Sequence, residues 1–491
     1  MNRTFIKKPI HVLMADSEKG GLKRTLGRTS LILLGIGAII GAGLFVRTAA
    51  ASAEAAGPAV TMSFLIASIG CAFAGICYAE FSSMFPIAGS AYTYAYATMG
   101  ELVAWVIGWA LIMEYALGAA TVAIAWSEYL NHLLGFTIPY QWCHSPFETS
   151  VDGISGIINL PALSILLLLT LLLIKGTQES AMVNGIIVFI KVAIVLVFIV
   201  IGFQYINADN YVPYIIPEGT PGHEGFFAHG YGGILRGAAI VFFAFIGFDA
   251  VSTAAQEAKN PQKDMPWGIL GSLVICTILY VLFAHVLTGV ANWQEYKIAG
   301  KEASVVYAIQ HHMPGYEWLG TLVTIAILAG FSSVILVMLM GQSRVFFSMS
   351  NDGLIPPIFA QLHSKFKTPY KSNWILFLFV GAFAAFIPGN IAGDLTSFGT
   401  LLAFILVCIG VMVLRKSNPE LKRPFKTPLV PLIPLLGVAV CSFMIISLDH
   451  TTQIVALFWM LLGFTIYFSY GFSKSKLQIE RKASKKSNPP S

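Results

Sequence analysis

Charged residues are scarce in this sequence. Asp, Glu, Lys and Arg make up 11% of the 491 residues, hydrophobic residues make up 56%, and the mean hydropathy is +0.74. Soluble domains carry roughly 25% charged residues, so this chain cannot cover an ordinary water-facing surface. The shortage of charge excludes a soluble enzyme, a nucleic-acid binder and a disordered scaffold, and it indicates an integral membrane protein.

Cysteine frameworks and catalytic motifs are also missing. Five of the six cysteines lie in apolar runs and only Cys143 lies in a polar connection, which favours packing roles over disulfides. The sequence has no HExxH, CxxC, P-loop or GxSxG motif, and its ten histidines are scattered. We therefore expect no enzyme activity, no metal centre and no cofactor. The first 29 residues hold seven basic residues and no apolar run, so no cleavable signal peptide is expected.

Long apolar runs, in contrast, are abundant. A membrane-spanning helix needs about 20 mainly apolar residues. The candidate spans are 30–54, 60–84, 89–133, 160–175, 181–204, 233–257, 267–290, 317–349, 373–389, 394–414, 428–448 and 452–472. The third and the eighth are long, and each is expected to be one tilted helix because neither contains a strong turn signal. The sequence predicts an all-α integral membrane protein with 12 transmembrane helices.

Positive charge is distributed unevenly among the connections. If the N-terminus lies inside the cell, 25 of the 30 Lys and Arg residues fall on the cytoplasmic side of the spans. Such a bias sets the orientation of membrane proteins. We therefore predict a multi-pass protein of the cell (plasma) membrane with both termini cytoplasmic, and a basic tail near anionic lipid.

Glycines interrupt two of the predicted spans near their middle. Residues 35–45 read GIGAIIGAGLF and residues 242–250 read FFAFIGFDA. Glycine weakens helical order, and matched interruptions five spans apart predict an inverted repeat with broken helices at the membrane midplane. Amides at a half-helix N-terminus attract a carboxylate, and free carbonyls accept from an ammonium. The pattern indicates recognition of a small zwitterion, with close helix packing as the alternative explanation of the glycines.

Charged residues within the spans are further candidates. Lys191 lies in a long apolar run, where an unpaired ammonium is costly, so it is either a proton-coupling residue or a structural lysine. A structural lysine would bond helix-end carbonyls or an acid such as Glu114, which is itself a candidate for the proton path. Asp249 follows Gly247 closely and either caps the second half of its helix or faces the substrate.

Other residues near the span ends and breaks have less specific predictions. Arg47 is expected to snorkel toward the outer face. Glu80 and Glu257, near cytoplasmic helix ends, suggest either an intracellular gate or interfacial solvation. Among the aromatics beside the second break, Phe243 is the one best placed to close over a substrate, with packing as the alternative.

Several longer motifs carry a family resemblance. They are GAIIGAGLF (37–45), YAEFSSMFPIAGSAYTYAY (78–96), FFAFIGFDAV (242–251), QEAKNPQKDMPWGI (256–269) and QSRVFFSMSNDGLIP (342–356). Together they resemble the amino acid–polyamine–organocation (APC) permease superfamily, within it the cationic amino acid transporter branch of bacterial type. The resemblance implies a five-plus-five inverted repeat, the LeuT-like fold, with two extra C-terminal helices and transport by alternating access.

The implied organisation divides the chain into five parts. These are a cytoplasmic N-terminal segment 1–29, a first repeat 30–204 with helices 1–5, a second repeat 226–414 with helices 6–10, helices 11–12 at 428–472, and a cytoplasmic basic tail 473–491.

The resemblance also implies a substrate site. The amides of Ala42 and Gly43, with the unwound Gly41, would bind a carboxylate. The ammonium would be taken by the carbonyls of Ile39, Phe243 and Ile246. Lys191 would occupy the place of an ion near helices 1 and 8, beside the hydroxyls of Ser332 and Ser333, and a lysine there favours proton over sodium coupling.

The predicted function is proton-coupled symport of L-amino acids by alternating access. The alternative is an amino acid exchanger selective for cationic amino acids without net proton coupling. Asp249 is the one candidate partner for a cationic side chain, so the choice between cationic and small neutral substrates stays open. Expected partners are the amino acid, protons and membrane lipids, with no nucleic acid, and a small membrane-protein partner is left open.

Overall fold

The computed structural model describes residues 5–9, 26–85, 90–150, 152–175, 181–220, 225–228, 230–255, 258–297, 304–366 and 368–487. Within these ranges the secondary structure is helical, and β-pairing is limited to two isolated bridges, Leu26 with Ala258 and Thr149 with Ser155. Glu257, one of the sequence candidates, lies outside the described residues.

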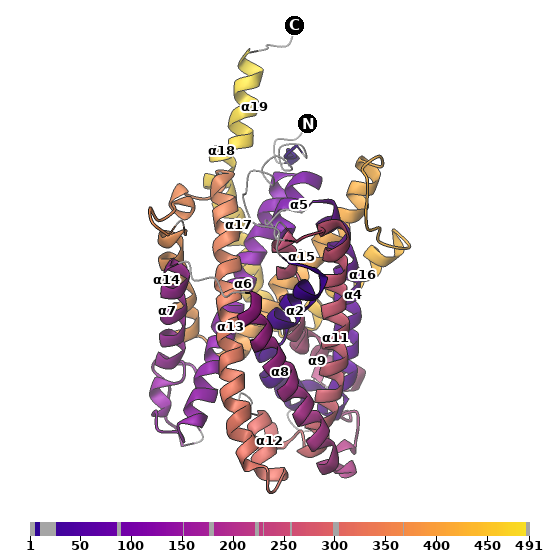
Figure 1. The fold of residues 1–491 in the computed structure, drawn as a ribbon, viewed down its shortest axis with the longest axis vertical. Coiled ribbons are helices and arrows are strands. Elements are labelled where there is room, and N and C mark those ends of the chain that lie inside the picture. Colours follow the sequence, from indigo (N-terminus) through magenta and orange to yellow (C-terminus); the bar gives the residue numbers. More distant parts are fainter. Residues whose placement is uncertain are drawn as a thin grey trace.

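The helices run side by side in one bundle (Figure 1). Eight helical segments in the described ranges are long and apolar enough to cross a membrane, and four more apolar helices are shorter. The longer helices outside the two interrupted spans are α4 (Val60–Met84), α6 (Glu101–Leu133), α7 (Leu160–Lys175), α8 (Ala181–Gly202), α11 (Pro261–Val290), α13 (Glu317–Asn351), α14 (Tyr370–Phe386), α15 (Gly389–Ser417), α16 (Leu432–Ser447) and α17 (His450–Ile466). The all-helical class is confirmed, whereas the twelve-span repeat stays a prediction.

One predicted span is wrong in its bounds. The run 89–133 is two helices, α5 (Ser90–Thr98) and α6, and not one tilted helix. Gly100 separates them with φ of +102°, and a Cβ there would lie 2.7 Å from the carbonyl carbon of Phe5. Only glycine fits both the backbone conformation and the close approach. The run 317–349 is indeed a single helix, α13.

The centre of the bundle is α6. Its side chains are buried on all sides, and it packs against α5, α7, α13, α14, α15 and α17. A helix that is apolar all round belongs in a core. By contrast, α8 and α17 expose large apolar side chains, among them Phe189, Val200 and Phe458. Such faces suit contact with lipid.

Both ends of the described chain pack at the same end of the bundle. Lys8 forms an ion pair of 3.0 Å with Asp352, which follows α13, and Tyr92 of α5 donates to the same carboxylate at 2.8 Å. The backbone N–H of Lys476 donates to the Asp352 carbonyl. From there α19 (Lys476–Ser487) extends away from the bundle, whereas α12 (Ser304–His312) lies at the opposite end (Figure 1).

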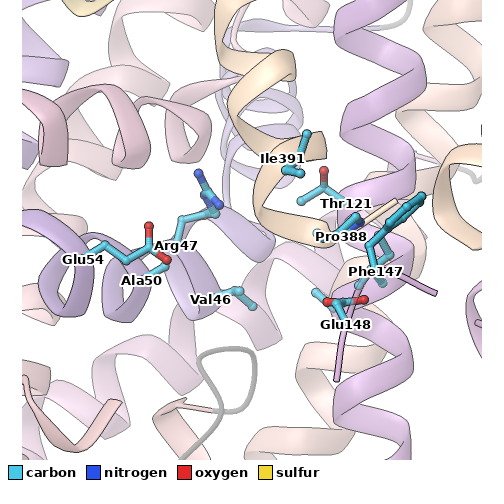
Figure 2. A pocket seen from close by; sticks show the side chains of 12 residues that line it. Val46, Arg47, Ala50, Glu54, Thr121, Phe147, Glu148, Pro388 and Ile391 are labelled. Carbon is cyan, nitrogen blue, oxygen red and sulfur yellow. The ribbon is translucent and has the colours of Figure 1, made fainter. Parts of the chain in front are cut away.

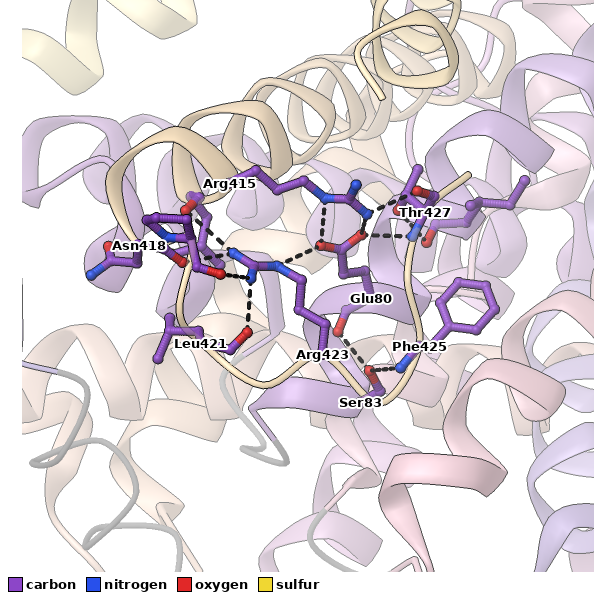
Figure 3. Close-up of polar contacts among 11 residues, drawn as sticks. Glu80, Ser83, Arg415, Asn418, Leu421, Arg423, Phe425 and Thr427 are labelled. Atoms are coloured by element: carbon purple, nitrogen blue, oxygen red, sulfur yellow. Dashed lines mark hydrogen bonds and ion pairs between the residues drawn. The ribbon is translucent and has the colours of Figure 1, made fainter. Parts of the chain in front are cut away.

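Glu80, near the end of α4, is buried and paired (Figure 3). It accepts from Arg415 Nε and Nη2 at 3.1 and 2.7 Å and from the Thr427 N–H at 2.7 Å, and Arg423 Nε lies 3.4 Å away. The prediction of interfacial solvation is therefore wrong for Glu80. Its carboxylate holds the connection between α15 and α16 against α4, because Arg415 in the last turn of α15 and Arg423 in that connection both converge on it.

Candidate functional site

The first interrupted span breaks inside the glycine-rich segment. Helix α2 (Arg28–Ile39) ends at Ile39, and Ile40 is extended with φ −73° and ψ 104°. The chain then resumes as a π-helix, η2 (Gly43–Arg47), followed by α3 (Thr48–Ala51) and a second π-helical turn, η3 (Ser52–Ala56). Turns of this type occur frequently at functional sites. The break leaves helix-end carbonyls on one side and helix-start amides on the other.

The second interrupted span breaks in the same manner. Helix α9 (Gly230–Phe242) passes into a 3₁₀ turn, η9 (Phe243–Phe245), Ile246 is extended, and α10 (Ala250–Thr253) begins after Asp249. Gly247 has φ of +114°, which L side chains rarely adopt. The backbone is thus opened over the residues that the sequence pattern singled out.

The two breaks pack directly against each other. A Cβ on Gly43 would lie 2.2 Å from the Cα of Ala244, and a Cβ on Gly247 would lie 2.7 Å from the carbonyl oxygen of Ala38. These glycines therefore permit close packing of the two breaks as well as an opened backbone.

Backbone groups suited to a zwitterion lie at this junction. The N–H groups of Ala42 and Gly43 stand at the start of a helix, where intrahelical acceptors are missing. The carbonyls of Ile39, from the first break, and Ala244, from the second, both accept from one hydroxyl, that of Tyr280 on α11, at 3.0 and 2.9 Å. Phe243 is buried at the start of the turn η9.

Tyr280 was not found by sequence reasoning. The sequence offers one indication of its role, which is a tyrosine within an otherwise apolar stretch of α11. A buried tyrosine hydroxyl normally finds a hydrogen-bond partner. Which partner it finds depends on the packing of α11 against α2 and on the path of the second break, which the sequence pattern alone does not specify.

Lys191 on α8 reaches the first break. Its Nζ donates to the carbonyl oxygens of Gly37 at 3.1 Å and Ile40 at 3.2 Å. Its stem crosses Gly330 of α13, where a Cβ would lie 2.7 Å from the Lys191 Cε. The side chain is therefore held between α2 and α13 and bonds helix-end carbonyls, which was one of the two structural alternatives. On α13, Ser332 donates to the Leu328 carbonyl of its own helix, and Ser333 is buried.

Glu114 and Asp249 form a second buried polar group. Tyr115 donates to Asp249 at 2.9 Å, and Asp249 makes no side-chain cap on α10, so the capping prediction is wrong. Glu114 is fully buried, and its carboxyl oxygens have no hydrogen-bond partner among the described residues. It is close enough to Asp249 for the two charges to interact. Glu114 is therefore not the hydrogen-bond partner of Lys191.

Arg47 lies one turn beyond the first break and is buried. It pairs with Asp394 of α15 and is 3% exposed. The prediction that Arg47 snorkels to the outer face is therefore wrong, because a carboxylate on a neighbouring helix offsets its charge within the bundle.

The chain is similar in sequence to known permeases and transporters over most of its length. Residues 26–470 match the family model described as amino acid permease. The chain is 43% identical to the branched-chain amino acid permease BcaP of Bacillus subtilis, over 96% of this chain and 98% of that protein. It is 40% identical to the methylthioribose transporter of Bacillus subtilis, over 97% and 100%, respectively. It is 34% identical to the vacuolar cationic amino acid transporter 2 of Arabidopsis thaliana, over 85% of this chain and 64% of that protein. The chain therefore belongs to the amino acid permeases of the APC superfamily, and it is a membrane transporter and not an enzyme.

Proposed function

We propose that this permease carries L-amino acids by proton-coupled symport, with the substrate held between the two helix breaks. The carboxylate would be bound by the amides of Ala42 and Gly43 beside the unwound Gly41. The ammonium would be bound by the carbonyls of Ile39, Phe243 and Ile246. The proposal is supported by helix-start amides and helix-end carbonyls meeting at one junction.

The substrate class we favour is neutral and branched-chain. Asp249, the candidate partner for a cationic side chain, accepts the Tyr115 hydroxyl at Oδ2, which leaves only Oδ1 without a partner among the described residues. The wall next to Gly41 is the side chain of Val334, an apolar surface. A permease of branched-chain amino acids is among the relatives with high identity over nearly the whole chain.

Coupling to protons rests on the position of Lys191. Its ammonium donates to two carbonyls at the end of α2, so charge on this nitrogen stabilises the broken end of that helix. Loss of the proton removes the charge, weakens both contacts and frees the α2 end to move. Proton release and uptake would then accompany opening and closing of the site. Glu114 is the second candidate on the proton path, because its buried carboxyl has no hydrogen-bond partner among the described residues.

The orientation that we propose places both termini in the cytoplasm. The end of the bundle that holds Lys8, Asp352 and α19 would then face the cytoplasm, and the end that holds α12 would face outward. This follows the excess of Lys and Arg on the terminal side.

Uptake into proteoliposomes tests the function. Labelled L-leucine, L-isoleucine, L-alanine, L-arginine and methylthioribose would be offered under an inward proton gradient or an inward sodium gradient. We expect accumulation of branched-chain amino acids driven by protons and lost in Lys191→Ala. Lys175→Ala, at the exposed end of α7, is the matched control and should transport normally.

Two results would overturn the proposal. Accumulation that requires sodium, or full proton-driven accumulation by Lys191→Ala, would reduce Lys191 to a structural residue. Strict one-for-one exchange of L-arginine without a proton requirement would favour the exchanger instead.

A further inference from the structure

Arg28, the first residue of α2, carries hydrogen-bond donors at the edge of the bundle. Its side chain is 51% exposed, and its guanidinium carbon lies 5.2 Å from the centre of the Trp267 ring on α11. Its Nε lies 3.7 Å from Oδ1 of Asp264, which is an ion pair but too long for a hydrogen bond. Arg28 makes no side-chain hydrogen bond with a described residue. Its planar fork of five N–H donors is therefore oriented by stacking and can bind an acceptor.

Two lysines and one carboxylate accompany Arg28. Lys263 precedes Trp267 by four residues, so the two side chains are neighbours on the surface of α11. Lys259 lies before α11, and its N–H donates at 2.8 Å to the carbonyl two residues before Arg28. Both lysines are exposed, whereas Asp264 is buried. Three cations and one carboxylate leave a net charge of +2 among these described groups.

The helix α11 presents an apolar face outward, beginning at Trp267. The exposed side chains of this face are spaced by seven and then four residues, so they share one side of the helix. They are Trp267, Val274, Ile278 and Leu282, each 45–59% exposed. The helix α2 lies against α11 beside Trp267, because a Cβ on Gly268 would lie 2.9 Å from the Cβ of Leu31. An exposed apolar face on a membrane-spanning helix contacts acyl chains, and tryptophan is enriched at the level of the headgroups.

We propose that Arg28, Lys263 and Trp267 form a binding site for an anionic phospholipid whose acyl chains lie along the exposed face of α11. The phosphate accepts from the N–H groups of Arg28, which keeps its stack on the indole ring. Lys263 supplies a second positive charge. Arginine suits this role because its planar fork matches the geometry of a phosphate and stacks on aromatic faces.

The arrangement favours a lipid over a soluble anion or an acidic protein. The cations adjoin an apolar face that is long enough for acyl chains, and a ligand with an anionic head and apolar tails satisfies both parts. Clusters of Lys and Arg beside a membrane span attract anionic lipid in the same way. Arg28 belongs to α2 and Lys263 to α11, so one bound lipid would hold the two helices together.

The lipid site is separate from the candidate substrate site. Arg28 begins α2, whereas the first break follows Ile39 at the other end of that helix. The pocket of about 450 Å³ that is lined by Arg47 and Glu54 lies beyond the break (Figure 2). Lipid binding can therefore be measured independently of transport.

The fluorescence of Trp267 tests the site, because this residue is part of it. The full-length protein would be placed in phosphatidylcholine nanodiscs that contain a series of mole fractions of brominated phosphatidylglycerol or brominated phosphatidylcholine, with bromine near the head of one acyl chain. Each protein would be measured with and without Trp267→Phe, so that the difference gives the quenching of Trp267 alone. We expect phosphatidylglycerol to quench Trp267 at lower mole fractions than phosphatidylcholine does.

Three variants locate the charge that carries this preference. Arg28→Gln and Lys263→Gln should each weaken the binding of phosphatidylglycerol by about 5-fold, which is the typical effect of one basic residue near the membrane surface. Lys416→Gln is the matched control, because Lys416 is an exposed cation in the last turn of α15, away from α2 and α11. It should bind phosphatidylglycerol as wild type does.

Three results would overturn the proposal. Equal quenching of wild type by the two lipids would mean that Trp267 faces bulk lipid without a headgroup site. An equal loss in Lys416→Gln would mean that the preference comes from diffuse surface charge. Soluble glycerol phosphate should leave the quenching unchanged, and displacement of the lipid by it would show that the cations bind a free phosphate compound instead.

Discussion

Replacement of Tyr280 by phenylalanine tests how firmly the two helix breaks are held together. The Tyr280 hydroxyl lies 3.0 Å from the Ile39 carbonyl oxygen and 2.9 Å from that of Ala244. A hydroxyl has one hydrogen, so it donates one full hydrogen bond at a time and is shared between the two carbonyls. Its removal leaves about one buried carbonyl unsatisfied, which costs about 1–3 kcal/mol.

The same change should weaken substrate binding. In the proposed site the Ile39 carbonyl binds the ammonium, and Tyr280 fixes that carbonyl against the second break. If the whole cost appears in binding, 1–3 kcal/mol corresponds to a loss of affinity of about 5- to 150-fold. Part of the cost will appear as lower stability of the free protein, so the lower half of this range is expected.

Tyr296→Phe is the matched control. Tyr296 is also fully buried and donates to a backbone carbonyl, that of Leu287, at 2.9 Å, but it lies outside the breaks. Thermal unfolding would be followed by tryptophan fluorescence and affinity by binding of labelled amino acid. Both variants should lose similar stability, and only Tyr280→Phe should lose affinity. Unchanged affinity in Tyr280→Phe would show that the hydroxyl is not part of the geometry that binds substrate.

Three further changes probe other parts of the molecule. Gly43→Val should abolish binding at the breaks, because even a Cβ would lie 2.2 Å from the Cα of Ala244, and retained affinity would remove the first break from the site. In the connection after α6, burial lowers the pKa of His144, but its hydrogen bond and ion pair with Glu128 outweigh burial and raise the pKa to about 8. The folded-state pKa of His144 exceeds its unfolded value of about 6.5, so the pair with Glu128 stabilises the fold, by at most about 2 kcal/mol. This stabilisation is fully present below pH 6.5 and is lost as the pH rises through 8. Unfolding midpoints of wild type and His144→Gln should therefore converge above pH 8, and a constant difference would contradict the assignment. Glu80→Gln leaves two arginines without their shared counter-charge and should destabilise by about 3–5 kcal/mol, measurable as a lower midpoint against the exposed control Glu420→Gln.

The breaks could be predicted from the sequence because their cause is local. Glycine spacing in 35–45 and 242–250 marks where the helices are weak, and the structure opens the backbone at Ile40 and at Ile246–Asp249 within those segments. Long apolar helices such as α4 and α13 were predictable for the same reason. The length and hydropathy of the segment are enough to predict a membrane-spanning helix, whichever helices pack beside it.

The partners of the buried charged groups were not predictable. Arg47 finds Asp394 and Glu80 finds Arg415, pairs separated by more than 300 residues in sequence. A single sequence gives each charge but not the helix that will lie beside it. The split at Gly100 was missed for a related reason, because the contact that demands glycine is made by the distant Phe5.

Two donors from different helices act on one short segment of the chain. Lys191 of α8 bonds the carbonyls of Gly37 and Ile40, and Tyr280 of α11 bonds that of Ile39, which lies between them. The end of α2 therefore cannot shift without disturbing both donors. Groups that share one mobile element are not additive in double-mutant cycles, with interaction energies of about 0.5–3 kcal/mol. Once Lys191→Ala has released the end of α2, Tyr280→Phe should cost less affinity than it does in wild type. Strictly additive losses would mean that the two donors act on independent parts of the site, and the coupling of Lys191 to the break would then have no structural basis.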